Sequence, residues 1–132
     1  MPGYAIKNIK ELDDSAVQFG LSPQVEARFG RKALGAESGG FSYQRLVPDF
    51  RQPFGHRHRE QEEIYIIVSG SGRVKIEEEI VDVKQWDAIR VAPQTKRGFE
   101  SGPDGLELLV FGAGESGDGE TFEDFWPPDA AS

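Results

Sequence analysis

The 132-residue sequence contains no cysteine and only two histidines. Without cysteine the protein has no disulfide, zinc ribbon, thiolate nucleophile or iron–sulfur cluster, so any metal ion would be held by imidazole, carboxylate, amide or water. Long hydrophobic runs are also absent. The longest, residues 64–68, is far too short to span a membrane, and residues 1–7 do not resemble a secretion signal. The sequence therefore predicts one small cytoplasmic domain.

Basic residues are scarce: 15 Lys and Arg stand against 23 Asp and Glu, which gives a formal net charge of −8. Six of the acids fall within residues 112–132, which contain no Lys or Arg, so the rest of the chain is close to neutral. Because phosphate backbones and anionic lipids are bound largely by Lys and Arg, we expect neither nucleic acid nor a membrane as a partner. Phe122, Phe125 and Trp126 are the tail residues expected to dock on the body.

Apolar and polar residues alternate along much of the chain, with the two-residue period of β-strands. The alternation is clearest in residues 73–77, 81–84, 89–91 and 106–110. Turns are expected about every eight to twelve residues, as in small sandwiches and barrels. The predicted turns lie at residues 70–72, 77–78, 92–94 and 102–105. Residues 25–33 fit a helix or a strand, and we favour the strand. The pattern predicts an all-β barrel.

The chain divides into three expected parts: an N-terminal extension that packs on the barrel (1–39), the barrel itself (40–112) and an acidic, partly flexible tail (113–132). Residues 63–68 are apolar on both faces of a strand, with Tyr65 on one side and Ile64 on the other. One side would face the barrel interior, and an N-terminal strand or a second subunit would cover the other. This pattern predicts a homodimer.

The residues suited to chemistry are concentrated in residues 54–65. His56 and His58 are two residues apart, so on a strand both rings project from one face, about 7 Å apart along the backbone. Residues 59–62 can turn the chain, after which the Glu63 carboxylate can meet the imidazoles. Two histidines and one carboxylate form a facial ligand set that leaves open positions for water, oxygen or a chelating ligand. The expected cofactor is a divalent transition metal (Mn, Fe, Ni, Co, Cu or Zn).

This segment resembles the first motif of the cupin family, in which two histidines one residue apart are followed by a glutamate, six residues and a glycine. Glu63 takes the glutamate position and Gly70 the glycine position. The resemblance extends over roughly residues 40–112 and implies a cupin-type double-stranded β-helix, or jelly-roll, barrel. The glycine that opens the motif is missing, because Asp49 and Phe50 lie where it would fall.

The second cupin motif is only partly present. Cupins usually carry a Gly-Asp pair, a proline, a glycine and a third metal-binding histidine there. Asp87 and Pro93 match this pattern, whereas Trp86 and Gln94 replace the glycines and Arg97 occupies the histidine position. An arginine is always protonated and has no lone pair to offer, so Arg97 cannot be a metal ligand.

Two interpretations of the pocket follow. In the first, His56, His58 and Glu63 hold the metal, and Arg97 lies just beyond it, where it binds a carboxylate or oxyanion of the ligand. In the second, Arg97 pairs with Glu63 and the histidines hydrogen-bond in a metal-free cup. We prefer the first interpretation.

Tyr65 and Gln44 are assigned with Arg97 to the binding of a small, anionic or oxygenated molecule. The resemblance implies either a metal-dependent oxygenase, isomerase or lyase acting on a small carboxylate or phenolic substrate, or a ligand-binding or regulatory module without turnover. No catalytic residue is assigned from the sequence.

Overall fold

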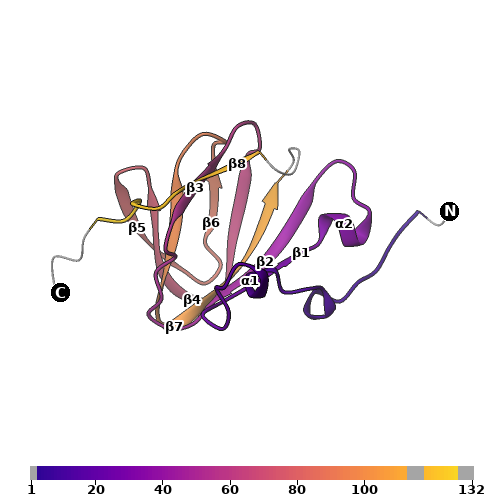
Figure 1. The fold of residues 1–132 in the computed structure, drawn as a ribbon, viewed down its shortest axis with the longest axis horizontal. Coiled ribbons are helices and arrows are strands. Elements are labelled where there is room, and N and C mark those ends of the chain that lie inside the picture. Colours follow the sequence, from indigo (N-terminus) through magenta and orange to yellow (C-terminus); the bar gives the residue numbers. More distant parts are fainter. Residues whose placement is uncertain (1–2, 113–117, 128–132) are drawn as a thin grey trace.

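The structure, a computed structural model, describes residues 3–112 and 118–127, which form one curled antiparallel sheet with short helices at its N-terminal side (Figure 1). The strands are β1 (Val25–Phe29), β2 (Gly40–Leu46), β3 (Gly55–His58), β4 (Glu63–Ile76), β5 (Glu79–Lys84), β6 (Ala88–Val91), β7 (Arg97–Gly112) and β8 (Gly119–Phe122). The helices are η1 (Ile9–Glu11), α1 (Ser15–Gln18) and α2 (Arg31–Leu34). The predicted all-β class is confirmed.

The sheet has the order β1-β2-β7-β3-β8, and β4 pairs with β5, β6 and β7. The strand favoured for residues 25–33 is confirmed for residues 25–29, which form β1, whereas residues 31–33 belong to helix α2. Within the described part of the chain, no helix is long and apolar enough to cross a lipid bilayer.

Two of the four predicted turns are wrong. Residues 77–78 and 92–94 do form turns, but β4 runs through residues 70–72 and β7 runs through residues 102–105. These two long strands pair with register shifts near Gly70 and Gly72. A Cβ atom on Gly70 would lie 2.1 Å from the carbonyl oxygen of Gly105, so glycine is needed here for two backbones to cross closely.

Two residues that stand at the positions of missing motif glycines have a left-handed backbone. Trp86 has a φ of 74° and Asp49 a φ of 54°. Asp tolerates this region because its short polar side chain can bond locally, whereas an ordinary side chain such as that of Trp86 costs roughly 1–2 kcal/mol there. The backbone of Trp86 is nevertheless held in place, because its backbone N–H donates to the carbonyl of Ile67 at 2.7 Å.

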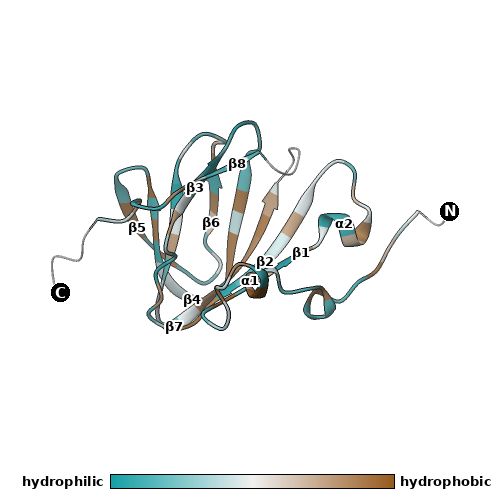
Figure 2. Ribbon diagram, in the orientation of Figure 1, coloured by the Kyte–Doolittle hydropathy of each residue, from teal (hydrophilic) through white to brown (hydrophobic). Residues whose placement is uncertain are grey.

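The core fills the concave side of the sheet, where residues of β1, β2, β4, β5, β6 and β7 meet. The alternation of hydrophobic and polar residues is visible along the strands in Figure 2. Tyr65 and Ile67 point inward and are almost fully buried, as the two-residue period predicts. The buried apolar cluster consists of Ala16, Val25, Leu46, Tyr65, Ile67, Val74, Val83, Val91, Phe99, Leu106, Leu108 and Val110.

The convex face of β4 is only partly covered. Ile64 is 41% exposed and lies opposite Phe111 of β7, which is 40% exposed. The N-terminal segment instead packs further along the sheet, where the Lys10 ammonium lies over the Tyr43 ring at 4.9 Å and Asp14 forms a bridge with Arg28 at the edge of β1. The predicted homodimer, which would cover Ile64, stays a prediction.

The second half of the acidic tail folds back onto the sheet. Strand β8 pairs with β3, and Phe125 is 9% exposed because its ring lies on the bare backbone of Gly55 and Gly98. Phe122 and Trp126 lie beneath the cations of Arg57 and Arg51. Residues 113–117 and 128–132, for which flexibility was expected, lie outside the described residues.

A buried carboxylate on the convex face links the N-terminal segment to the sheet. Glu26 of β1 is 6% exposed and accepts hydrogen bonds from Lys10, Arg28 and Arg45 at 2.5, 2.6 and 2.9 Å. Burial alone would raise the pKa of Glu26, but these three cations outweigh it and hold the pKa at about 2, against an ordinary value of 4.5. The ionised carboxylate is therefore favoured in the folded state.

This arrangement predicts a specific acid sensitivity. Glu26→Gln should lower the free energy of unfolding by roughly 2–3 kcal/mol above pH 5, and the difference from the wild type should vanish as the pH falls from 4.5 towards 2. The sign follows because the folded state binds this proton less readily than the unfolded chain does. Urea titrations between pH 2 and 7 measure the difference. Glu62→Gln, which breaks an exposed pair with Arg90, should cost under about 1 kcal/mol at every pH.

Candidate metal site

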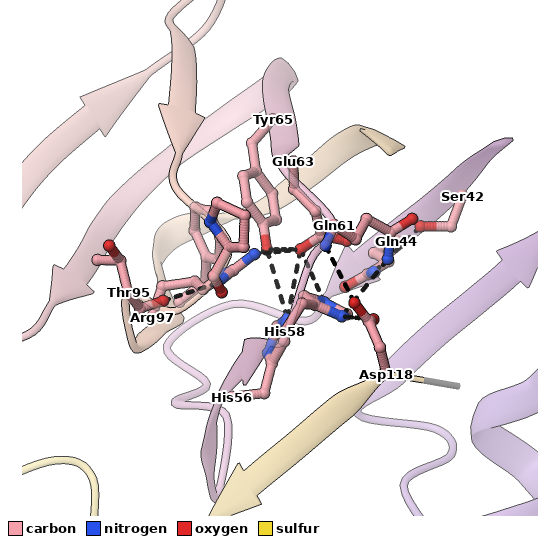
Figure 3. A network of polar contacts seen from close by, with 12 residues as sticks. Ser42, Gln44, His56, His58, Gln61, Glu63, Tyr65, Thr95, Arg97 and Asp118 are labelled. Atoms are coloured by element: carbon pink, nitrogen blue, oxygen red, sulfur yellow. Dashed lines mark hydrogen bonds and ion pairs between the residues drawn. The ribbon is translucent and has the colours of Figure 1, made fainter. Parts of the chain in front are cut away.

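The three predicted metal ligands converge where β3 faces the start of β4. The rings of His56 and His58 project from the same face of β3, with centroids 5.2 Å apart and planes nearly perpendicular. Glu63 Oε1 lies 3.5 Å from Nε2 of His56 and 3.3 Å from Nε2 of His58 (Figure 3). One donor atom from each residue can be chosen so that all lie within 4.8 Å of one another. One ion of about 2.0–2.2 Å bond length could therefore contact all three.

His58 is held in the orientation of a metal ligand. Its Nδ1 lies 2.7 Å from Oδ1 of Asp118, while its Nε2 is buried and has no hydrogen-bond partner among the described residues. The nearby Glu63 carboxylate raises the pKa of His58, burial opposes it, and Asp118 adds to the increase. A buried imidazole nitrogen without a partner is costly, and a metal ion would satisfy it.

The carboxylate of Glu63 is ionised and tightly fixed. Its Oε1 accepts a hydrogen bond from the Tyr65 hydroxyl at 2.6 Å and another from Arg97 Nη2 at 2.8 Å. Burial by itself would raise the pKa of Glu63, but the histidines and Tyr65 hold that pKa far below its usual range. A permanently charged oxygen thus faces both imidazoles.

Arg97 is buried under this carboxylate. Its side chain is fully buried; Nη1 donates to the carbonyls of Pro93 and Thr95 at 3.1 and 2.6 Å, and Nε donates to the Tyr65 hydroxyl at 3.1 Å. With the bond to Glu63, four of its five N–H groups have protein acceptors. The structure therefore contains both predicted arrangements at once: Arg97 pairs with Glu63, and the donor atoms of His56, His58 and Glu63 converge.

A pocket of about 730 Å³ opens onto the site from the side of helix α2. Its polar lining includes the half-buried His58 and Glu63, and its apolar wall includes Phe29, Phe41 and Val110. Its cationic lining includes the half-buried Arg31 and the exposed Lys32. Ser42 also lines it, and Gln44 Nε2 donates to the Ser42 hydroxyl at 3.2 Å. The pocket is an apolar cup with a cationic entrance and an anionic, imidazole-bearing floor.

The three residues assigned to ligand contact do not line this pocket. Arg97 is occupied by backbone carbonyls, Tyr65 points from β4 into the core and bonds Glu63, and Gln44 reaches the site only through Ser42. Their contact with a ligand stays a prediction.

Sequence reasoning missed Asp118 as a partner of the site, and it missed Arg31 and Lys32 at the pocket. Asp118 lies in an acidic, glycine-rich stretch in which nothing separates it from its neighbours. The backbone N–H groups of Glu60 and Gln61, together with the His58 ring, outweigh burial and lower the pKa of Asp118.

No family model and no curated protein matches the chain. Several solved structures are similar along most of its length. A cupin protein from Bacteroides fragilis is 23% identical with a TM-score of 0.71, covering 89% of this chain and 89% of that one. The polyketide cyclase RemF from Streptomyces resistomycificus is 19% identical with a TM-score of 0.73, covering 95% of this chain and 88% of that one.

A nucleoside dehydratase from Streptomyces is 15% identical with a TM-score of 0.70, and the match covers 90% of this chain and 91% of the enzyme. At these identities the likeness concerns the fold. The jelly-roll prediction is thus confirmed by the strand arrangement and by its neighbours, and the chain has a cupin-type fold.

Proposed function

We propose that this protein binds a divalent transition metal through His56, His58 and Glu63, and that the metal faces a pocket for a small anionic or oxygen-rich molecule. The observation that carries the proposal is the state of His58. One of its nitrogens is bonded to a carboxylate and the other is buried, unpaired and 3.3 Å from Glu63 Oε1. A histidine that gives its second nitrogen to a carboxylate is the usual arrangement around protein-bound metals.

A bound divalent ion would supply Lewis-acid polarisation of a ligand oxygen. The protein's own residues have separate tasks. Arg97 and Tyr65 hold the Glu63 carboxylate in place by hydrogen bonds, while Phe29, Phe41 and Val110 keep the pocket wall apolar. Arg31 and Lys32 bring positive charge to the pocket, which favours an anion.

These features fit a small carboxylate or phenolic ligand with an apolar body. Polyketides and nucleosides, the molecules named for two of the similar enzymes, are likewise oxygen-rich. We propose no reaction beyond the classes that the cupin resemblance implies: oxygenation, isomerisation or lyase chemistry.

A second candidate is a metal-free cup that binds or senses a small molecule without turnover. It is favoured by the contacts of Glu63, because the Tyr65 hydroxyl and Arg97 already occupy the two lone pairs of Oε1. In that case the histidines would bind the ligand directly by hydrogen bonds.

Metal titration separates the two candidates. His56→Gln and His58→Gln should each lower the affinity for Zn²⁺ or Co²⁺ by more than about 100-fold. Mutation of a residue that only hydrogen-bonds to a metal ligand already lowers metal affinity roughly 10- to 100-fold, and loss of the ligand itself should cost more. Calorimetry and elemental analysis of the loaded, dialysed protein measure this. Glu62→Gln is the matched control, since Glu62 pairs with exposed Arg90 and should leave the affinity unchanged.

A low metal content after loading would contradict the proposed metal site. If the wild type retains less than about a tenth of an equivalent of Mn, Fe, Co, Ni, Cu and Zn together after loading, metal binding is refuted. Thermal stabilisation by small carboxylates under the same conditions would then favour the metal-free cup.

A further inference from the structure

We infer that Asp118 is a positioning residue that fixes the tautomer of His58, so that Nε2 presents its lone pair to a metal ion. This inference rests on the proposed function and adds to it a residue outside the three ligands. Asp118 lies 60 residues from His58 in the sequence and reaches it from the start of β8.

The Asp118 carboxylate is itself immobilised. The residue is 8% exposed, and its Oδ2 accepts a hydrogen bond from the backbone N–H group of Glu60 at 2.9 Å. The same oxygen accepts a second hydrogen bond from the backbone N–H group of Gln61 at 3.0 Å (Figure 3). Its carbonyl oxygen accepts from the N–H of Arg59 at 3.2 Å. These bonds tie the loop between β3 and β4 to the approach of β8, and they leave Oδ1 facing the imidazole.

The tautomer follows from the chemistry of the two groups. An ionised carboxylate can only accept hydrogen bonds, so the 2.7 Å contact requires a proton on Nδ1 of His58. A neutral imidazole carries one ring proton, and with that proton on Nδ1 the lone pair lies on Nε2. This is the nitrogen that is buried without a partner and that faces Glu63.

The pairing of β8 with β3 positions Asp118 beside His58. The register His58↔Gly119 places Asp118 one residue beyond the paired strand, next to the ring. Phe125, seated on Gly55 and Gly98, anchors the segment that follows β8. If Asp118 only stabilised the loop between β3 and β4, it would need the bonds to Glu60 and Gln61 but not the bond to His58. A test must therefore measure which ring nitrogen of His58 carries the proton.

Asp118→Asn supplies that test with almost no change of shape. An amide has one accepting oxygen and one donating nitrogen. If its oxygen keeps the N–H groups of Glu60 and Gln61, its NH₂ faces Nδ1 and forces the proton onto Nε2. In the metal-free protein at basic pH, long-range ¹H–¹⁵N spectra should show His58 as the Nδ1–H tautomer in the wild type and the Nε2–H tautomer in the variant.

The affinity for Zn²⁺ alone, measured by calorimetry, should fall about 10- to 100-fold in the same variant. Glu120→Gln is the matched control, because Glu120 lies on β8 and pairs with Arg57 away from the site. It should change neither the tautomer nor the affinity.

The outcomes separate this inference from the proposed function. If His58 keeps the Nδ1–H tautomer in Asp118→Asn, or is Nε2–H in the wild type, the inference is overturned. If the tautomers behave as expected but the wild type binds no Zn²⁺, the inference about Asp118 holds and the proposed metal site fails. Should the variant not fold, the wild-type spectrum alone still decides the tautomer.

Discussion

Arg97→Met is expected to lower the free energy of unfolding by about 3–5 kcal/mol, the usual cost of removing one partner of a buried ion pair. The guanidinium is fully buried, so its loss leaves the Glu63 carboxylate without its cation. It also removes the donors of the Pro93 and Thr95 carbonyls. Methionine fills much of the volume, which limits the cavity contribution. Chemical denaturation monitored by circular dichroism measures the change.

Two controls identify the cause. Adding Glu63→Gln to Arg97→Met removes the stranded charge and should recover part of the lost stability. Arg57→Met breaks a more exposed pair with Glu120 and should cost less than about 1 kcal/mol. A loss of under 1 kcal/mol in Arg97→Met would show that Glu63 does not depend on this cation, and the account of the site floor would be wrong.

Gly70→Ala is expected to destabilise the fold by about 2–5 kcal/mol for two additive reasons. Gly70 has a φ of 81°, where an ordinary residue costs roughly 1–2 kcal/mol. The added methyl group would also lie 2.1 Å from the backbone carbonyl oxygen of Gly105, and forcing two strands apart costs about 1–3 kcal/mol more. Urea titration of the purified variant gives the value.

Gly20→Ala separates the two contributions. Gly20 has a φ of 71°, but a Cβ atom there would meet nothing within 4 Å. This variant should therefore lose only the conformational part, about 1–2 kcal/mol. Equal losses in the two variants would mean that β4 and β7 can separate at no cost, which contradicts the close crossing.

Local spacing was enough to predict the centre of the site. Period two places His56 and His58 on one face, and a short connection to Glu63 brings the carboxylate opposite them, so adjacent strands determine the geometry. The resemblance to the cupin motif predicted the jelly-roll fold. Both predictions depend on residues close together in the sequence.

Longer-range features were not accessible in this way. Glycine pairs at residues 70–72 and 102–105 signal a turn or a close crossing equally well, and only the pairing of β4 with β7 distinguishes the two. Asp118 meets His58 across 60 residues, which no periodicity records. Arg97 was identified as unusual, but its direction also depends on Tyr65 and Glu63, which lie 32 and 34 residues earlier in the chain.

The pairing of β3 has a kinetic consequence. Four residues of β8 pair with β3, whereas β7 contributes one pair, His56↔Arg97. Detachment of β8 would leave the strand that carries both imidazoles held only by this pair and by the bond from the His58 N–H to the Pro93 carbonyl. Short terminal strands open far more often than a whole domain unfolds. The residence time of a captured ion would then be set by fraying of this strand, and a chelator would strip the protein without denaturing it.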